Sequence, residues 1–420
     1  MLTVIAVAAL TIRVVYVLVI ARGLPLGTDS TWYLLVSGPL SDGRGFLNPS
    51  QFFSGHVVAT AGYPPGYPTF LALVTRLVGS GRDTFTVAGA LMGTITVVLT
   101  GCIGRRLAGS AVGLVAAALA ALYPMLIAVD GSLMSETLSI PLLYAAVFVA
   151  ITAMDRPGYW RWALVGLLLG LVALTRADAV VTVVVLVGAC ALALPTPLRT
   201  RVLTAGVTLG VVALVVLPWV VRNDQRVGEP TVATISSSAT IAGANCASTY
   251  SGSLKGYWDF DCMDAARQNT LGEARWTRFA RTQGIDYATG HIAEVPLVVA
   301  VRELRLLGLY DPIGQMKLET IESRSRTWLT IGWVVWLPIM VLGAFGLPAL
   351  VRIRRRAVPL LAVIGSTVLV VAASYGNQRF RTAIEPAVLV AAALTLTRWI
   401  PALSRRIEAR VDDAPDHRAV

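Results

Sequence analysis

Apolar runs long enough to cross a lipid bilayer recur along most of this chain, and short arginine clusters separate them. A membrane-spanning helix needs roughly 20 mainly apolar residues. The sequence therefore predicts an all-α integral membrane protein. We expect about ten spans, at residues 2–21, 84–104, 110–128, 137–154, 159–175, 178–195, 203–221, 327–350, 357–375 and 383–400.

Composition agrees with this class and argues against a soluble protein. The chain is 55% hydrophobic and 14% charged, and its mean hydropathy is +0.69, values far from those of a soluble domain. A net charge of +11 would suit nucleic-acid binding, but the basic residues fall in short clusters between apolar runs. Membrane proteins distribute positive charge in this way, so we expect no nucleic-acid partner.

The arginine clusters alternate from one loop to the next. One set of loops carries them, at 105–106, 156–161, 199–201, 352–356 and 405–406, whereas the other set carries acids or mixed charge. The positive-inside rule then makes the first set and both termini cytoplasmic. The abundance of Arg, Ala, Val and Gly suggests a bacterial plasma membrane. No small-residue cleavage site follows the first run, so we expect a retained anchor.

The predicted spans divide the chain into four parts. Residues 1–221 hold seven spans and a first outside loop at 22–83, residues 222–326 form an extracytoplasmic loop or small cap, residues 327–404 hold three spans, and residues 405–420 form a charged, disordered cytoplasmic tail. The stretch 66–78 is too short to span and follows two prolines. We expect it to be a helix lying on the membrane surface.

The polar loop at 222–326 contains two cysteines, Cys246 and Cys262. Two cysteines in one loop on the oxidising side of a membrane predict a disulfide, with two free thiols as the alternative. In the chain-entropy model, closing a loop of this length stabilises the fold by about 3 kcal/mol.

Asp29 lies in the polar stretch that follows the first span. A carboxylate at the level of the lipid headgroups could accept a proton from a hydroxyl as a general base. Alternatively, Thr28, Asp29 or Ser30 could cap a short helix at 31–36. Other residues of the same loop are candidates for contact with an acceptor or a cation, namely Tyr33, His56, Tyr63 and Tyr67.

Two further acids lie at the outside start of the fourth span. Glu136 occupies a first helical turn, where interaction with the helix dipole stabilises a carboxylate by about 0.3–1 kcal/mol without any other role. Asp130 precedes it, in what we interpret as an exposed loop. Either acid could instead join Asp29 in holding a cation or positioning an acceptor.

Arginines in the loops predicted to lie outside the membrane run against the positive-inside bias, and their presence there suggests a specific role. Guanidinium groups suit bidentate phosphate binding. The alternative is salt bridging, of Arg176 to Asp178 and of the arginines at 379–381 to Glu385. The candidates for binding the phosphate of a sugar donor are Arg176, Arg222, Arg379 and Arg381.

Patterns for cofactors are weak. The sequence contains no HExxH pattern and no cysteine-rich metal pattern. It also contains neither a Walker loop nor a dinucleotide fingerprint, so we expect no nucleotide cofactor. Whether a metal is bound stays open, and a divalent cation is one option.

Several of these motifs form a pattern, defined by their order along the chain and by their predicted position on one side of the membrane. In chain order they are Asp29, Pro-Pro-Gly-Tyr-Pro at 64–68, Ser-Glu at 135–136, Leu-Thr-Arg at 174–176, Pro-Trp-Val-Val-Arg-Asn at 218–223, and Arg-Phe-Arg at 379–381 before Glu-Pro at 385–386. This pattern resembles the GT-C superfamily of integral-membrane glycosyltransferases. The most similar branch contains protein O-mannosyltransferases and lipid A aminoarabinose transferases. Residues 243–262 resemble the outside loop of its actinobacterial members.

The resemblance implies a function. Such enzymes move one sugar, a hexose or a pentose, from a polyprenyl-phosphate carrier to an envelope glycan, lipid or protein outside the membrane, generally with inversion. Asp29 would match their first-loop acid, acting as a base, and Arg379 and Arg381 would lie at the carrier phosphate. Many members carry Asp-Glu in this loop, whereas Ser30 follows Asp29 here. Alternative functions are a transporter or flippase of a polyprenyl-linked lipid, or a non-catalytic scaffold with the same fold.

Overall fold

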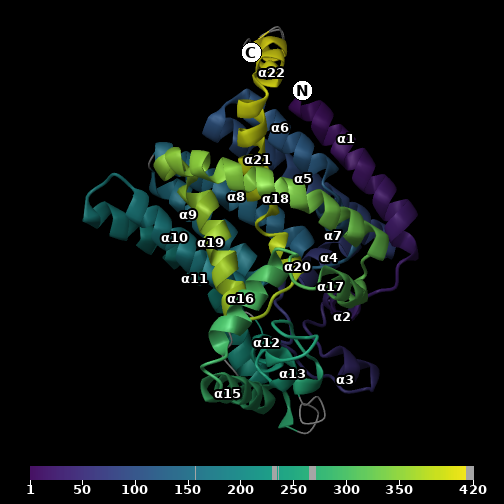
Figure 1. Ribbon diagram of the computed structural model, residues 1–420. Coiled ribbons are helices and arrows are strands. Elements are labelled where there is room, and N and C mark those ends of the chain that lie inside the picture. The colour runs from purple at the N-terminus through teal and green to yellow at the C-terminus, as the bar shows by residue number, and fades with distance from the viewer. Residues whose placement is uncertain (157, 229–233, 235, 264–270, 413–420) are drawn as a thin grey trace.

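The computed structural model describes residues 1–156, 158–228, 234, 236–263 and 271–412, and helices dominate this part of the chain (Figure 1). Its one extended pairing is an isolated antiparallel bridge between Leu47 and Ala59. The predicted all-α class is therefore confirmed.

Every predicted span coincides with helix. The first run forms α1 (Leu2–Val15), a π-helical turn η1 (Tyr16–Ile20) and a 3-10 turn η2 (Ala21–Gly23). The other apolar helices are α5 (Arg82–Ala108), α6 (Ser110–Leu122), α7 (Pro124–Gly131), α8 (Glu136–Asp155), α9 (Tyr159–Thr175), α10 (Ala179–Ala193), α11 (Leu198–Val227), α18 (Arg326–Arg352), α19 (Val358–Ala373) and α21 (Glu385–Trp399).

Shorter helices fill the polar segments. The first loop holds α2 (Thr28–Ser41), α3 (Pro49–Phe53) and α4 (Gly66–Leu77). The long loop holds α12 (Ser236–Ala244), α13 (Ala247–Tyr250), η3 (Asp261–Met263), α15 (Glu273–Gly290), α16 (Val295–Leu306), α17 (Pro312–Glu319) and η4 (Thr320–Glu322). The remaining elements are η5 (Arg354–Ala357), α20 (Gln378–Arg381) and α22 (Pro401–Asp412).

The helices differ in their capacity to cross a membrane. By length and composition, 6 of the described helical segments could do so, and α6 with α7 would make a seventh. The axes of α6 and α7 differ by 53°, because Tyr123 is extended between them and Pro124 begins α7. Two further apolar helices, α9 and α10, are shorter, with 17 and 15 residues. The helical character of the ten predicted runs is confirmed, but their number as spans stays a prediction.

Small residues allow close helix packing in the core. A Cβ added to Gly104 of α5 would lie 3.1 Å from the Cα of Gly113 in α6. A Cβ on Gly346 of α18 would overlap the carbonyl of Ala391 in α21. Close backbone approach of this kind is typical of helices packed within membranes.

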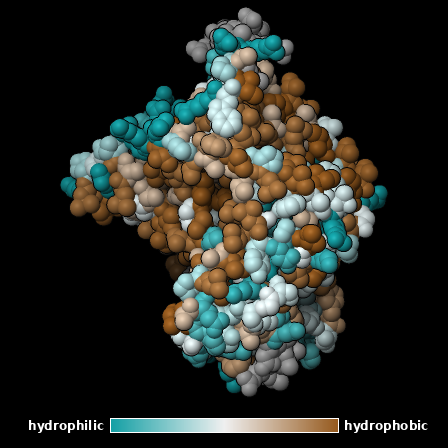
Figure 2. Space-filling model, in the orientation of Figure 1, coloured by the Kyte–Doolittle hydropathy of each residue, from teal (hydrophilic) through white to brown (hydrophobic). Residues whose placement is uncertain are grey.

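Two ends of the molecule differ in character. The N-terminus of α1 and helix α22 lie at one end, and α3, α12, α13 and α15 lie at the other (Figure 1). On the face that Figure 2 shows, hydrophobic residues cover most of the helical bundle, whereas hydrophilic residues gather over the end that carries α15. Helices of the first loop, α2 and α3, and of the long loop, α12 and α13, therefore lie toward the end opposite α22 (Figure 1).

Two boundaries differ from the prediction. Helix α11 continues beyond residue 221 to Val227. The tail predicted to be disordered is helical as far as Asp412, and residues 413–420 lie outside the described residues. In the long loop, residues 229–233, 235 and 264–270 also lie outside them.

Candidate functional site

Arg379 is the centre of a cluster of acids drawn from distant parts of the chain. Its Nη1 lies 2.8 Å from Oδ2 of Asp29 and 3.4 Å from Oε1 of Glu322. Its Nε donates to Oε1 of Glu136. The short helix α20 carries the arginine, and its cap Asn377 accepts a hydrogen bond from the Arg379 backbone nitrogen at 2.8 Å. One guanidinium group therefore joins α2, η4 and α8.

The electrostatics of Arg379 follow from this geometry. Its side chain is 11% exposed. Burial disfavours the charged form, but Glu136, Glu322 and Asp29 together raise the pKa of Arg379 well above its usual value. The guanidinium group is therefore permanently charged, and it offsets the repulsion among the three carboxylates.

Asp29 lies in the first turn of α2, and its carboxylate points toward Arg379. The N-cap of this helix is Gly27, and no side chain caps it, so neither Asp29 nor its neighbours act as the cap considered from the sequence. Oδ1 of Asp29 accepts a hydrogen bond from the hydroxyl of Tyr63 at 2.5 Å. Among the carboxylates joined to Arg379, Asp29 is the most exposed, at 25% against 2% for Glu136 and 19% for Glu322.

Glu136 has a larger role than that of a helix-dipole acid. It begins α8 and is 2% exposed. Besides Arg379, it pairs with Nη1 of Arg176 at 2.5 Å. Arg176 also donates to both oxygens of Asp178, at 2.9 and 3.0 Å, as the sequence suggested. Arg379 and Arg176 both pair with Glu136 and favour its ionised form. Glu136 is therefore a negative charge that shares Arg379 with Asp29.

An aromatic wall supports Asp29. The ring of Tyr33 packs edge-on against Tyr63 and Tyr67, with centroids 5.2 and 5.1 Å away. Burial and then the charge of Asp29 raise the pKa of Tyr63 well above its usual value, so its hydroxyl stays a hydrogen-bond donor. Tyr33 and Tyr67 are 2% and 1% exposed. Of the three predicted tyrosines, Tyr63 alone touches a carboxylate of this cluster.

The structure adds Glu322 and its neighbour Ser323 to the site, and sequence reasoning missed both. The backbone nitrogen of Gly27, which caps α2, donates to Oγ of Ser323 at 2.6 Å. Ser323 adopts a left-handed conformation with φ +61°. The available signal was the density of charge at 319–326, immediately before a predicted span.

Three predicted residues lie apart from the cluster. Arg222 donates to the carbonyls of Thr60 and Phe46, at 2.6 and 2.9 Å, and so holds the first loop. Arg381 is buried against Glu385 at 3.0 Å, as the salt-bridge alternative predicted. His56 is exposed in the loop after α3.

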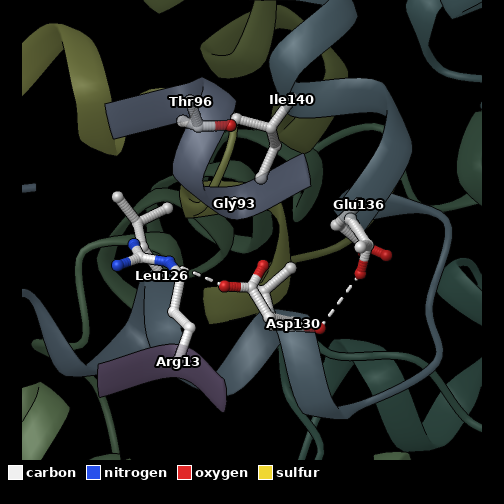
Figure 3. Close-up of a pocket in the computed structure, with 9 residues that line it drawn as sticks. Arg13, Gly93, Thr96, Leu126, Asp130, Glu136 and Ile140 are labelled. Atoms are coloured by element: carbon white, nitrogen blue, oxygen red, sulfur yellow. Dashed lines mark hydrogen bonds and ion pairs between the residues drawn. The ribbon is translucent and has the colours of Figure 1, made fainter. Parts of the chain in front are cut away.

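Asp130 is not in an exposed loop, which corrects our interpretation of the sequence. It lies in α7, is 2% exposed, and pairs with Nε of Arg13 at 2.8 Å. Arg13 also donates to the carbonyls of Ala120 and Ala121, at 3.1 and 3.2 Å, near the break between α6 and α7. This buried pair ties α1 to the bent helices. Arg13, Asp130 and Glu136 line one small pocket (Figure 3).

The acids of the site are paired with arginines. Within the described ranges, no group of three or more His, Cys, Asp or Glu side chains is placed to hold a metal ion. Arg379 lies among Asp29, Glu136 and Glu322, and it occupies the position that a shared cation would need.

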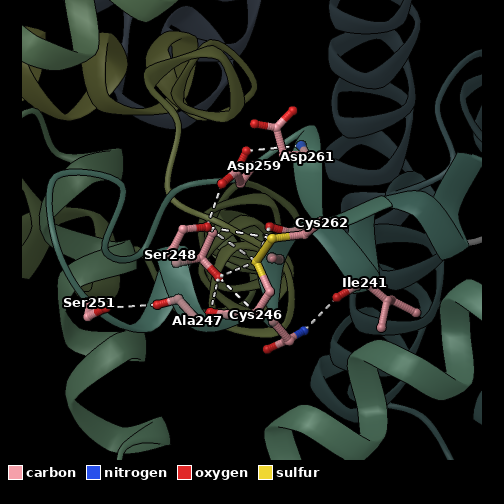
Figure 4. Close-up of a disulfide and its surroundings, with 12 residues drawn as sticks. Ile241, Cys246, Ala247, Ser248, Ser251, Asp259, Asp261 and Cys262 are labelled. Atoms are coloured by element: carbon pink, nitrogen blue, oxygen red, sulfur yellow. Dashed lines mark hydrogen bonds between the residues drawn. A yellow bond between two sulfur atoms is a disulfide. The ribbon is translucent and has the colours of Figure 1, made fainter. Parts of the chain in front are cut away.

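The predicted disulfide is confirmed. Cys246 and Cys262 are bonded, with an S–S distance of 2.08 Å (Figure 4). Between them, Oγ of Ser248 donates to Oδ2 of Asp259 at 2.5 Å. The bridge closes the part of the long loop that carries Tyr257, whose hydroxyl accepts a hydrogen bond from Asn377, the cap of α20, at 3.2 Å.

Comparison with known proteins supports this fold. Residues 63–221 match the dolichyl-phosphate-mannose-protein mannosyltransferase family. No curated protein matches the chain. The structure resembles the oligosaccharyltransferase AglB from Archaeoglobus fulgidus in complex with an inhibitory peptide and a dolichol-phosphate, with a TM-score of 0.57 and 13% identity over 100% of this chain and 52% of that one.

Other solved structures are also similar. The Archaeoglobus fulgidus oligosaccharyltransferase tethered to an acceptor peptide aligns with a TM-score of 0.58 and 15% identity, over 98% of this chain and 51% of that one. ArnT from Cupriavidus metallidurans, bound to undecaprenyl phosphate, aligns with a TM-score of 0.45 and 14% identity, over 98% and 80%. The present chain spans about half the length of the oligosaccharyltransferase. The chain therefore shares an all-α fold with the Archaeoglobus fulgidus oligosaccharyltransferase, and residues 63–221 match the mannosyltransferase family.

Proposed function

We propose that this protein is a glycosyltransferase that moves a single sugar from a polyprenyl-phosphate carrier to an acceptor on the extracytoplasmic side, with inversion. The observation that carries the proposal is the position of Asp29, the most exposed carboxylate in a cluster centred on Arg379. The fold and the family match over residues 63–221 support the same class of reaction. The carboxylate and guanidinium groups lie together at one end of the bundle.

The proposed reaction is one displacement. Asp29 accepts the proton of an acceptor hydroxyl, whose oxygen attacks the anomeric carbon of the sugar. The bond from that carbon to the phosphate oxygen breaks, and polyprenyl phosphate leaves with the electron pair. Positive charge from Arg379 and Arg176 offsets the charge that grows on the phosphate. The carrier supplies the activated leaving group, so the reaction needs no nucleotide.

The ion pairs of the site also give Arg379 a positioning role. Arg379 holds Asp29 and Glu136 in place before substrate binds. Positioning of this kind lowers the reorganisation required during the reaction. Partial transfer of the Arg379 charge to the carrier phosphate would leave Asp29 freer to accept a proton. Donor binding would then precede deprotonation of the acceptor.

Substitution of Asp29 by asparagine tests the proposal. Asparagine keeps the size of the side chain and can still accept the Tyr63 hydrogen bond. Transfer from a labelled carrier should fall by about 10²–10⁴, as expected for loss of a general base. Carrier binding and thermal stability should stay near those of the wild type.

Asp83→Asn is the matched control, because Asp83 is also an acid in the first turn of a helix. It is 41% exposed and pairs only with Arg22 on the surface among the described ion pairs. Its activity should equal that of the wild type. A folded Asp29→Asn protein with more than about a tenth of wild-type transfer would contradict the assignment of Asp29 as the base.

A further inference from the structure

The end of η4 and the residues before α18 complete the wall of the site. Glu322, the last residue of η4, reaches Arg379, and the next residue, Ser323, accepts the hydrogen bond from Gly27. The left-handed conformation of Ser323, with φ +61°, is uncommon for a residue with a side chain. Strain of this kind often marks a functional segment, and the next residue is Arg324.

Arg324 is buried without hydrogen-bond partners. Its side chain is 0% exposed, and Oε2 of Glu319 lies 3.6 Å from Nη1, beyond normal hydrogen-bond distance. Neither Nε, Nη1 nor Nη2 makes a hydrogen bond. Among the buried side chains that the structure describes, no other arginine has all three nitrogens in this state.

The other arginines of the site are already engaged by acids. Arg379 donates to Asp29 and Glu136, and Arg176 donates to both oxygens of Asp178. These groups are bound to carboxylates before any substrate arrives. Arg324 differs because its hydrogen-bonding capacity is unused.

A second guanidinium group adds unused donors beside Arg324. Arg381 donates through Nε to Glu385 at 3.0 Å, but its Nη1 and Nη2 make no hydrogen bond. Both arginines act electrostatically on Glu319 and Glu385, and Arg324 also acts on Glu136. The two guanidinium groups therefore lie near the same two buried acids, Glu319 and Glu385.

We propose that Arg324 binds a phosphate group together with the unpaired nitrogens of Arg381. A phosphate offers several acceptor oxygens, and planar guanidinium groups bind them in pairs. This inference rests on the proposed function, under which the group is the phosphate of the polyprenyl carrier. It makes Arg324 a binding residue that the sequence did not reveal. It adds to Arg379, which holds the acids before substrate binds.

The test measures binding separately from transfer. Purified protein is titrated with polyprenyl phosphate, with the corresponding polyprenol and with inorganic phosphate. The wild type should prefer polyprenyl phosphate to polyprenol. Arg324→Gln should lower the affinity for polyprenyl phosphate by about tenfold to a hundredfold, which corresponds to one charge-assisted contact, and should leave polyprenol binding unchanged. Weaker binding of inorganic phosphate alone would identify a free anion as the ligand and overturn the assignment to the carrier.

Arg305→Gln is the matched control for removal of a buried guanidinium group. Arg305 is also 0% exposed, but it donates to the carbonyls of Lys255 and Ser253. Its substitution should leave carrier affinity unchanged. Arg324→Lys keeps the charge beside Glu319 and serves if the glutamine variant does not fold. Lysine lacks the planar fork, so carrier affinity should still fall severalfold.

The outcomes separate this inference from the proposed function. If the wild type binds polyprenyl phosphate and transfers sugar, but a folded Arg324 variant binds the carrier equally well, the phosphate assignment is wrong and the proposed function stands. If the wild type neither prefers polyprenyl phosphate to polyprenol nor transfers sugar, the proposed function fails, and the assignment of Arg324 to the carrier fails with it.

Discussion

At the scale of single residues, the site is a set of carboxylates whose ionised forms are stabilised by two arginines. Asp29, Glu136 and Glu322 surround Arg379, and Glu136 is also held by Arg176. Removing one member of a buried ion pair costs about 3–5 kcal/mol, because its partner is left as an uncompensated charge. Arg379 therefore cannot be judged from activity alone, since its loss would also disturb the acids.

Glu319 links the stability of the site to pH. Burial raises the pKa of Glu319 to about 7, although the charge of Arg324 opposes the shift. Between the unfolded value of 4.5 and about 7, the folded chain keeps a proton that the unfolded chain releases. The stabilisation is fully present below pH 4.5 and is lost as the pH rises through 7, at a cost of about 3 kcal/mol.

Substitution of Glu319 by glutamine should remove this dependence. The amide cannot ionise, so the melting temperature of Glu319→Gln should vary less between pH 5 and 8 than that of the wild type. Thermal unfolding in detergent over this range is the measurement. Equal slopes for the two proteins would mean that Glu319 titrates at a similar pH in the folded and unfolded states.

At the scale of elements, the site depends on the contact between the start of α2 and the turn η4. No side chain separates them at Gly27, where an added Cβ would overlap the carbonyl of Ile321 and lie 3.0 Å from the Cα of Glu322. The hydrogen bond from Gly27 to Ser323 closes the same contact. Asp29 and Glu322 therefore approach Arg379 together, from two elements whose backbones lie in close contact at Gly27.

A methyl group at Gly27 should separate the two elements. Gly27→Ala should displace η4 and reduce sugar transfer by up to about a hundredfold, as a misplacement of about 1 Å in a catalytic site can do. Gly23→Ala is the control from the same connection, because no atom lies within 4 Å of its added Cβ. Initial rates of transfer by the two variants are compared. Similar rates would mean that the contact at Gly27 does not position the site.

At the scale of the whole molecule, α2 and α20, which carry Asp29 and Arg379, lie away from the end that carries α22 and the start of α1 (Figure 1). Two arginine clusters lie at the other end of α8 from the site. Arg106 and Arg356 pair with Asp155, the last residue of α8, whereas its first residue, Glu136, pairs with Arg379. By the positive-inside rule, we predict that the site faces out of the cytoplasm. An extracytoplasmic site suits a donor attached to a lipid carrier, because no nucleotide sugar is required there.

Reporter fusions test this orientation. A reporter active only outside the cytoplasm should work after Ser50, Tyr250 and Gln378, and should be inactive after Leu107, Thr200 and Arg355. The physical reason is that short arginine-rich loops resist translocation. Outside activity of the fusion at Arg355 would reverse the orientation of the neighbouring spans and place the site in the cytoplasm.

The sequence by itself determined the fold class, the helical runs and the disulfide. The length of an apolar run and the position of an arginine cluster are local properties of the sequence. They were enough to locate the helices and to predict which loops share a side of the membrane. Cys246 and Cys262 were the two cysteines outside the predicted spans, so their pairing needed no tertiary information. Asp29, Glu136 and Arg379 were found because each is a charge at the end of an apolar run.

Only the tertiary structure decided which charges meet. The partner of Arg379 could not be read from spacing, because Asp29 lies 350 positions away and Glu136 lies 243 positions away. The exposed-loop interpretation of Asp130 was wrong, because helix packing places Arg13 beside it. The burial of Arg324 likewise follows from the packing of the long loop. Hydropathy acts along a segment, whereas ion pairing and desolvation depend on how separate segments pack.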